Sequence, residues 1–199
     1  MRFRKTGAPI SFIIPSGNLG NGVAALWTKK MGLPIQQVHF AHNANHAVVD
    51  YLNSGDYEPS DTISTLANAM DVGAPSNVER LKALYPDFSL LKRDVAATSV
   101  NDASIQNAIR KSEKHWGQII CPHTATAATV REQIGESTNE WVLVSTAHPA
   151  KFETIVEPLI GKPVEVPAPL KAILLNPSQS QNISPNLLEL LDALSGPKV

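Results

Sequence analysis

The chain has 199 residues, a formal net charge of −1, 43% hydrophobic residues and one cysteine, Cys121. This length supports a single domain with its own core. The net charge is close to zero and the sequence contains no basic block, which argues against nucleic-acid or anionic-membrane partners. One cysteine excludes an internal disulfide, and neither a membrane-length apolar run nor a signal-peptide core is visible, so we expect a cytoplasmic protein.

The first predicted element is a buried strand that leads through a glycine loop into a helix. Phe12–Ile14 is an apolar run, and Ser16–Asn21 reads SGNLGN. Apolar residues then recur at helical spacing: Val23, Leu26, Trp27 and Met31. Such a junction gathers free backbone N–H groups and the positive end of a helix dipole, which favours phosphate binding over the alternative of a purely structural turn. The loop matches neither the dinucleotide fingerprint nor a P-loop, which disfavours a nucleotide-binding protein.

The following segments alternate between strands and helices, which indicates a parallel α/β sheet. A helix stop at Gly32–Pro34 precedes a second strand over Ile35–Phe40, and a short helix then ends near Gly55. Residues 56–75 look irregular, which in a compact domain favours a functional segment. Further helices are predicted over about 77–84, 102–117, 122–133, 152–159 and from Ser184 as N-cap, strands over 119–120 and 141–144, and a proline-rich loop over 161–182.

Polar clusters follow the predicted strands at residues 16–21, 42–46, 122–126 and 145–149. Ligands of open parallel sheets lie beyond the carboxyl ends of the strands, so we expect these clusters to form one pocket. Histidines lie in three of them: His42, His46, His123 and His148. A zinc site is the alternative, but no suitably spaced carboxylate accompanies them. We therefore predict surface or pocket-lining histidines and no metal.

Several other polar residues have two interpretations each. Thr146 and His148 follow a predicted strand and either cap the next helix or bind a ligand. Arg80 either pairs with a glutamate in solvent or clamps a second anion. Lys151 is interpreted as a solvated helix residue.

Four motifs resemble the threonine synthase family of the bacterial and fungal type, in the family's order: FIIPSGNLGNGVAALWTKKMGLPI, TLANAMDVGAPSNVERL, PHTATAA and VSTAHPAKF. The resemblance implies the carboxyl-terminal half of a fold-type-II pyridoxal 5′-phosphate enzyme (tryptophan synthase beta-like), a three-layer parallel sheet flanked by helices. It implies conversion of O-phosphohomoserine and water to threonine and phosphate. Residues 1–160 would form part of the catalytic domain, and 161–199 a proline-rich loop and a carboxyl-terminal helix packing on it.

The resemblance also implies roles for individual residues. The cofactor phosphate would be held by Gly17, Asn18, Leu19, Gly20 and Asn21. Thr146 would hydrogen-bond the pyridine nitrogen. Asn77 and Arg80 would hold the substrate's phosphate or carboxylate, and His123, Thr124 and His148 would line the pocket.

The chain also departs from the family pattern. The family's Schiff-base lysine lies in an F-K-D segment before the glycine loop, and this chain has neither that segment nor the upstream asparagine that contacts the cofactor hydroxyl. His46 replaces a usual aspartate, and Cys121 a usual acidic residue. We therefore expect no catalytic residue in this chain and no activity alone.

The missing segment leaves two kinds of protein open. In the first, the chain is half of a threonine synthase, and its partner would be the missing amino-terminal half or a homo-oligomer. In the second, the chain would be a remnant that binds a phosphorylated ligand or another subunit. A sheet without its neighbouring strands would expose an edge, so we also expect poor solubility or self-association.

Overall fold

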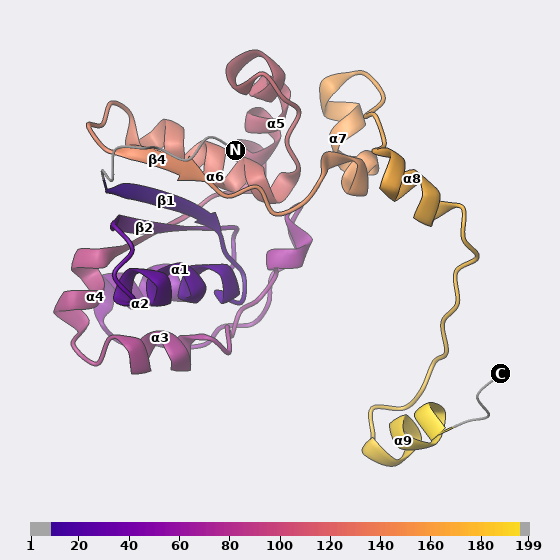
Figure 1. Cartoon of the computed structure of the whole chain (residues 1–199), viewed down its shortest axis with the longest axis horizontal. Coiled ribbons are helices and arrows are strands. Elements are labelled where there is room, and N and C mark those ends of the chain that lie inside the picture. Colours follow the sequence, from indigo (N-terminus) through magenta and orange to yellow (C-terminus); the bar gives the residue numbers. More distant parts are fainter. Residues whose placement is uncertain (1–8, 196–199) are drawn as a thin grey trace. The chain divides into compact units, whose positions relative to one another are not determined.

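The computed structural model describes residues 9–195 and is drawn in Figure 1. The chain divides between Glu165 and Val166 into two compact units. The second unit contains α8 (Ala168–Leu174) and α9 (Leu187–Ser195). The predicted boundary after residue 160, and the packing of residues 161–199 on the first domain, stay predictions.

The first unit contains a four-stranded parallel sheet in the order β3-β2-β1-β4. Its strands are β1 (Ile10–Pro15), β2 (Ile35–His42), β3 (Val95–Ser99) and β4 (Glu140–Leu143). In register, Phe12 of β1 lies opposite Val38 of β2 on one side and Val142 of β4 on the other. Because all pairs are parallel, the carboxyl ends of the strands meet at one edge.

Helices cover both faces of this sheet, which confirms the three-layer α/β prediction (Figure 1). On one side lie α1 (Gly20–Lys30), α2 (Ala47–Ser54), α3 (Val78–Leu84) and α4 (Phe88–Asp94). On the other lie α5 (Asp102–Trp116) and α6 (Pro122–Ile134). Three short elements complete the unit: η1 (Asn68–Met70), η2 (Pro149–Phe152) and α7 (Glu153–Ile160).

Close packing of α1 on β2 fixes the start of this helix. Phe40 is fully buried, and a Cβ placed on Gly22 would lie 2.4 Å from its ring, so only glycine fits there without a shift. Leu26 of the same helix is also fully buried. However, Trp27 and Met31, which belong to the predicted apolar stripe, are 51% and 80% exposed. The predicted stripe was therefore wrong over its second half.

Other sequence predictions were wrong in the middle and at the end of the chain. Residues 119–120 form no strand, because they pair with no neighbour and lead directly into α6. The sequence did not suggest α4 or β3. The proline-rich stretch contains α8, and α9 begins after Asn186, whose side chain accepts from the Glu189 N–H in place of the predicted Ser184 cap. Within residues 9–195, no helix is long and apolar enough to cross a membrane.

Candidate functional site

The glycine loop after β1 leaves a row of backbone donors unused. Ser16 donates its N–H to Ala41 of β2, and the next bonded N–H is that of Val23, which reaches Leu19. Between them, the N–H groups of Gly17–Asn21 find no acceptor within the part of the chain that the structure describes. Unpartnered N–H groups at a helix start are the usual binding site of an anion.

Leu19 fixes the shape of this loop. It is the N-cap of α1 and has φ 62°, a left-handed conformation that is rare for leucine. Its side chain is 1% exposed and packs in the core, which holds the backbone in this conformation. A left-handed residue at such a junction turns successive N–H groups toward one side, as in anion-binding nests.

The loop forms one wall of a pocket of about 250 Å³. Gly17–Asn21, Thr146 and His123, all predicted as site residues, line it together. The end of β1 (Pro15), Ser16, and Ala69 and Met70 of η1 also line it. A Cβ placed on Gly20 would meet no atom within 4 Å, so this glycine borders open space rather than packed protein. The pocket therefore presents unused donors around a space that a phosphate could fill.

Asn77 and Arg80 lie beside the loop without lining the pocket. Asn77 Nδ2 donates to the backbone oxygen of Asn18 at 2.6 Å, and Arg80 Nη1 donates to Asn77 Oδ1 at 2.8 Å. Ser76 donates to Asn18 Oδ1 from its N–H at 2.7 Å and from its hydroxyl at 3.0 Å. The start of α3 is thus attached to the loop, a contact that the sequence did not indicate.

His123 is a buried, neutral pocket residue. Its Nε2 accepts the N–H of Ala69 at 3.1 Å, so in the neutral ring the proton resides on Nδ1. Burial lowers the pKa of His123, the nearby Lys151 charge lowers it further, and the Asp71 carboxylate opposes both. Nδ1 has no partner among residues 9–195.

Thr124 is also buried but does not line the loop pocket. Its hydroxyl contacts Cys121 Sγ and Ser145 Oγ, both at 3.3 Å.

A buried polar network holds the irregular residues 56–75, which we call the strap. Asn43, fully buried at the end of β2, donates to Asp71 Oδ1 at 2.7 Å and to Thr65 Oγ1 at 2.9 Å. Asn45 accepts the N–H of Ile63 at 2.7 Å. Because η1 belongs to the strap, this network sets the pocket wall opposite the loop. The sequence signal that could have indicated this network is the pair Asn43 and Asn45, which follows β2 in the same polar cluster as His42 and His46.

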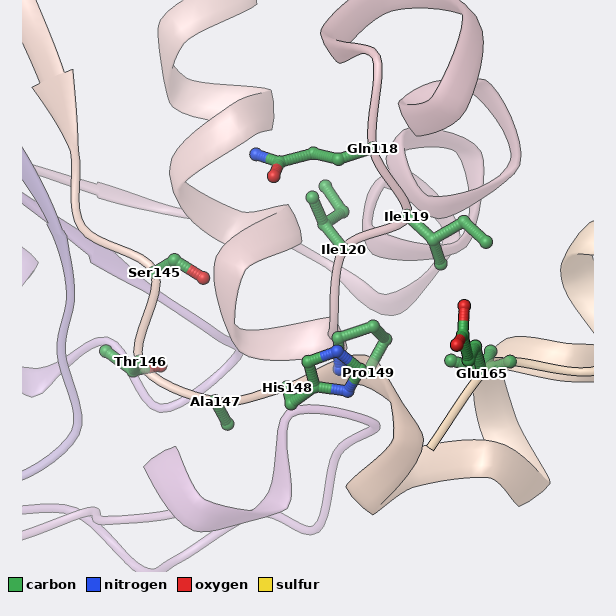
Figure 2. Close-up of a pocket in the computed structure, with 10 residues that line it drawn as sticks. Gln118, Ile119, Ile120, Ser145, Thr146, Ala147, His148, Pro149 and Glu165 are labelled. Carbon is green, nitrogen blue, oxygen red and sulfur yellow. The ribbon is translucent and has the colours of Figure 1, made fainter. Parts of the chain in front are cut away.

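A second pocket, of about 540 Å³, shares Thr146 with the first. Figure 2 shows Ser145, Thr146 and Ala147 along one side, with Gln118 and Ile120 from the segment before α6 across from them. His148 also lines this pocket, and its Nδ1 accepts the N–H of Ala150 at 3.2 Å. His148 therefore caps η2, one of its two predicted interpretations.

The remaining histidines do not form a metal site. His42 is 2% exposed at the end of β2, so the prediction of a surface or pocket-lining position was wrong for this residue. His46 is exposed and contacts Asp50 Oδ2 at 2.6 Å. Among residues 9–195, no group of three or more histidine, cysteine or acidic side chains is arranged to hold a metal.

Comparison with known proteins gives one consistent result. The family profile described as "Threonine synthase, C-terminal" matches residues 124–194. Threonine synthase from Buchnera aphidicola subsp. Acyrthosiphon pisum is 36% identical over 174 residues, which cover 86% of this chain and 40% of that protein.

Solved structures agree with the sequence comparison. Threonine synthase from Escherichia coli aligns with a TM-score of 0.83 at 31% identity, covering 96% of this chain and 45% of that one. The PLP-bound threonine synthase from Brucella melitensis aligns with a TM-score of 0.76 at 28% identity, covering 83% and 41%. The chain thus spans less than half the length of these relatives. It belongs to the threonine synthase family and corresponds to the carboxyl-terminal part of those enzymes.

Proposed function

We propose that the glycine loop binds the phosphate of pyridoxal 5′-phosphate, and that this chain forms one part of a threonine synthase site. Such a site converts O-phosphohomoserine and water to threonine and phosphate. The observation that carries the proposal is the row of unused N–H groups over Gly17–Asn21 beside open space at Gly20. The PLP-bound relative from Brucella melitensis supports the choice of cofactor.

The residues divide into cofactor and substrate roles. Gly17–Asn21 hold the phosphate, and the Thr146 hydroxyl, which lines the same pocket, hydrogen-bonds the pyridine nitrogen without supplying a charge. When bound, pyridoxal phosphate supplies an electron sink for negative charge that develops on an amino-acid substrate. Arg80 is exposed and uses one Nη1–H on Asn77, which leaves other guanidinium donors for the substrate's phosphate or carboxylate.

Three further residues shape the pockets in this proposal. His123 stays neutral near pH 7 because burial lowers its pKa, so it offers the substrate a hydrogen-bond donor without a charge. His148 lines the second pocket, and the Thr124 hydroxyl contacts the hydroxyl of Ser145, another residue of that lining, at 3.3 Å. A substrate that lies beside the cofactor and extends past Thr146, which lines both pockets, would reach this second pocket.

The covalent step requires a lysine that these residues do not provide. No lysine lines the loop pocket within residues 9–195, and Lys151 is exposed. The resemblance places the family's lysine in a segment before the glycine loop. We infer that a segment outside this chain supplies it, either the amino-terminal half of the enzyme or another subunit. The chain alone would then bind the cofactor but would release no phosphate from O-phosphohomoserine.

The binding half of the proposal is tested with Gly20→Val. The probe is pyridoxamine 5′-phosphate, because it lacks the aldehyde that would add to surface lysines. Calorimetry should detect binding by the parent chain, and the variant should lose more than about tenfold in affinity because the valine side chain would occupy the phosphate space. The matched control is Ala24→Val, which adds bulk at an exposed position of the same helix and should bind like the parent.

Two results would contradict the proposal. Gly20→Val could bind as tightly as the parent, or pyridoxamine without its phosphate could bind as tightly as the phosphorylated probe. Turnover of O-phosphohomoserine by the chain alone would contradict the inference about the lysine, and it would leave the phosphate site unaffected.

The second candidate function is a phosphate-ligand-binding or subunit-interaction module. The observation that favours it is an intact donor loop in a pocket without a lysine among its described lining residues. Adding a polypeptide that carries the amino-terminal part of the Escherichia coli relative separates the two. Restored phosphate release supports the enzyme, and cofactor binding without any restored turnover supports the module.

A further inference from the structure

We propose that Ser76 is a positioning residue that fixes the orientation of the Asn18 side-chain amide, so that Asn18 turns its NH₂ group toward the phosphate held by the glycine loop. This inference rests on the proposed function and adds a residue that neither the motifs nor the comparisons assign. Ser76 directly precedes Asn77, the N-cap of α3, and is 58 residues away from Asn18 in the sequence.

The orientation follows from hydrogen-bond chemistry. The Ser76 N–H lies 2.7 Å from one terminal atom of the Asn18 amide, and a backbone N–H can only donate. That amide atom must therefore be the oxygen, Oδ1. The Ser76 hydroxyl donates to the same oxygen at 3.0 Å. If the Asn18 amide were rotated by 180°, its NH₂ group would face the Ser76 N–H, and both groups are donors. The two hydrogen bonds to Oδ1 would then be lost.

The backbone of Asn18 is held from the same side. Asn77 Nδ2 donates to the Asn18 carbonyl oxygen at 2.6 Å, which occupies this group as well. Arg80 Nη1 donates to Asn77 Oδ1 at 2.8 Å, so the Asn77 amide is oriented in its turn. Both oxygens of Asn18 thus accept from the start of α3, and neither is free to face an anion.

The remaining polar group of the side chain is a donor. Asn18 Nδ2 has no hydrogen-bond partner within residues 9–195, and Asn18 lines the loop pocket. It joins the N–H groups of Gly17–Asn21, which are also unpartnered there. The pocket wall therefore offers donors without an opposing oxygen from Asn18. That arrangement favours a ligand whose oxygens all accept, which describes an ionised phosphate monoester.

The experiment compares Ser76→Ala and Ser76→Thr with the parent chain. Calorimetry measures the affinity for pyridoxamine 5′-phosphate, and ¹H–¹⁵N spectra follow the Asn18 side-chain NH₂ resonances. Ser76→Ala removes one of the two hydrogen bonds to Oδ1 and should weaken binding by about twofold to tenfold. Ser76→Thr keeps a hydroxyl at the same position and should restore affinity to within about twofold.

The NH₂ resonances provide a readout that a merely structural role of Ser76 would not change. In the parent chain they should shift when the probe saturates the pocket, together with the backbone N–H signals of Gly17–Asn21. In Ser76→Ala they should shift before any ligand is added, because the amide is held by one donor fewer.

The outcomes separate this inference from the proposed function. If the parent binds the probe and the loop N–H signals move while the Asn18 NH₂ does not, the phosphate site stands and the inference is wrong. Equal affinities of the parent and Ser76→Ala, or a Ser76→Thr variant as weak as Ser76→Ala, would also overturn it. Failure of the parent chain to bind the probe at all would overturn the proposed function and this inference with it.

Discussion

The glycines of the loop region have different physical roles. A Cβ on Gly17 would lie 2.7 Å from the Met70 Cα, and one on Gly22 would lie 2.4 Å from the Phe40 ring, so both are needed for close packing. Gly20 meets nothing within 4 Å and borders the pocket. The sequence predicts a phosphate loop here but not this division, because the atoms that decide it belong to residues far along the chain.

At His42 the structure predicts a dependence of stability on pH. Burial, followed by the charges of His39 and His46, lowers the pKa of His42 from 6.5 to about 4. Between these two pH values the unfolded chain binds a proton that the folded chain does not, so stability is full above pH 6.5 and falls toward pH 4. The loss from this residue is on the order of 2–3 kcal/mol.

The variant His42→Phe should reduce this loss. Nε2 of His42 has no partner among the described residues, so an apolar ring loses no hydrogen bond at that atom. Urea unfolding at pH 7 and pH 4.5 should give a smaller difference in the free energy of unfolding for the variant. His39, whose pKa burial also lowers to about 4, keeps part of the dependence. If the difference in the free energy of unfolding between pH 7 and pH 4.5 were the same in the variant as in the parent, His42 would already be protonated in the folded protein at pH 4.5.

At the scale of elements, the sequence predicted best where local signals were strong. β1 follows from an apolar run, and the start of the helix behind the glycine loop follows from apolar periodicity. α5 begins at Asp102, within the predicted range, and its N-cap is Asn101, whose side chain accepts the Ser104 N–H. β3 was missed because Val95–Ser99 is short and follows α4 without a turn residue between them. Its strand state comes from pairing with β2, which a local pattern cannot reveal.

The candidate site was predictable in part for the same reason. The loop directly follows β1, and Thr146 lies three residues beyond the end of β4; in a parallel sheet such positions converge on one edge. The strap could not be placed, because its position depends on buried asparagine side chains rather than on apolar periodicity. Likewise, the contact between Ser76 and Asn18 joins two surface segments through hydrogen bonds alone.

The strap gives a prediction at this scale. Asn43→Ala would leave the buried carbonyl of Ala67 and the Asp71 carboxylate without their Asn43 donor. The free energy of unfolding should therefore fall by about 2–4 kcal/mol. Hydrogen exchange at the Thr65 and Gly73 N–H groups should accelerate. Affinity for pyridoxamine 5′-phosphate should fall, because η1 forms the wall opposite the loop.

The control for this variant is Ser60→Ala. The Ser60 hydroxyl makes a single 3.4 Å contact with the Gly73 carbonyl, so its removal should leave both exchange and affinity close to the parent values. If Asn43→Ala instead kept the parent's exchange rates at Thr65, the buried network would not be what holds the strap.

At the scale of the whole molecule, the described chain contains one sheet whose two edge strands are β3 and β4. Within residues 9–195, β3 pairs only with β2 and β4 only with β1. Unpaired strand edges present free donors and acceptors to other chains, so self-association of the isolated chain stays a prediction. The relatives are more than twice as long as the part this chain matches. Our proposal that a segment outside this chain supplies the lysine is compatible with that length.

A crystal structure of the chain with pyridoxamine 5′-phosphate would show whether the N–H groups of the glycine loop hold a phosphate. We predict that the phosphate oxygens lie within hydrogen-bond distance of the Gly17–Asn21 N–H groups and that the pyridine nitrogen faces Thr146. A phosphate bound elsewhere, for example in the larger pocket beside Glu165, would contradict the account.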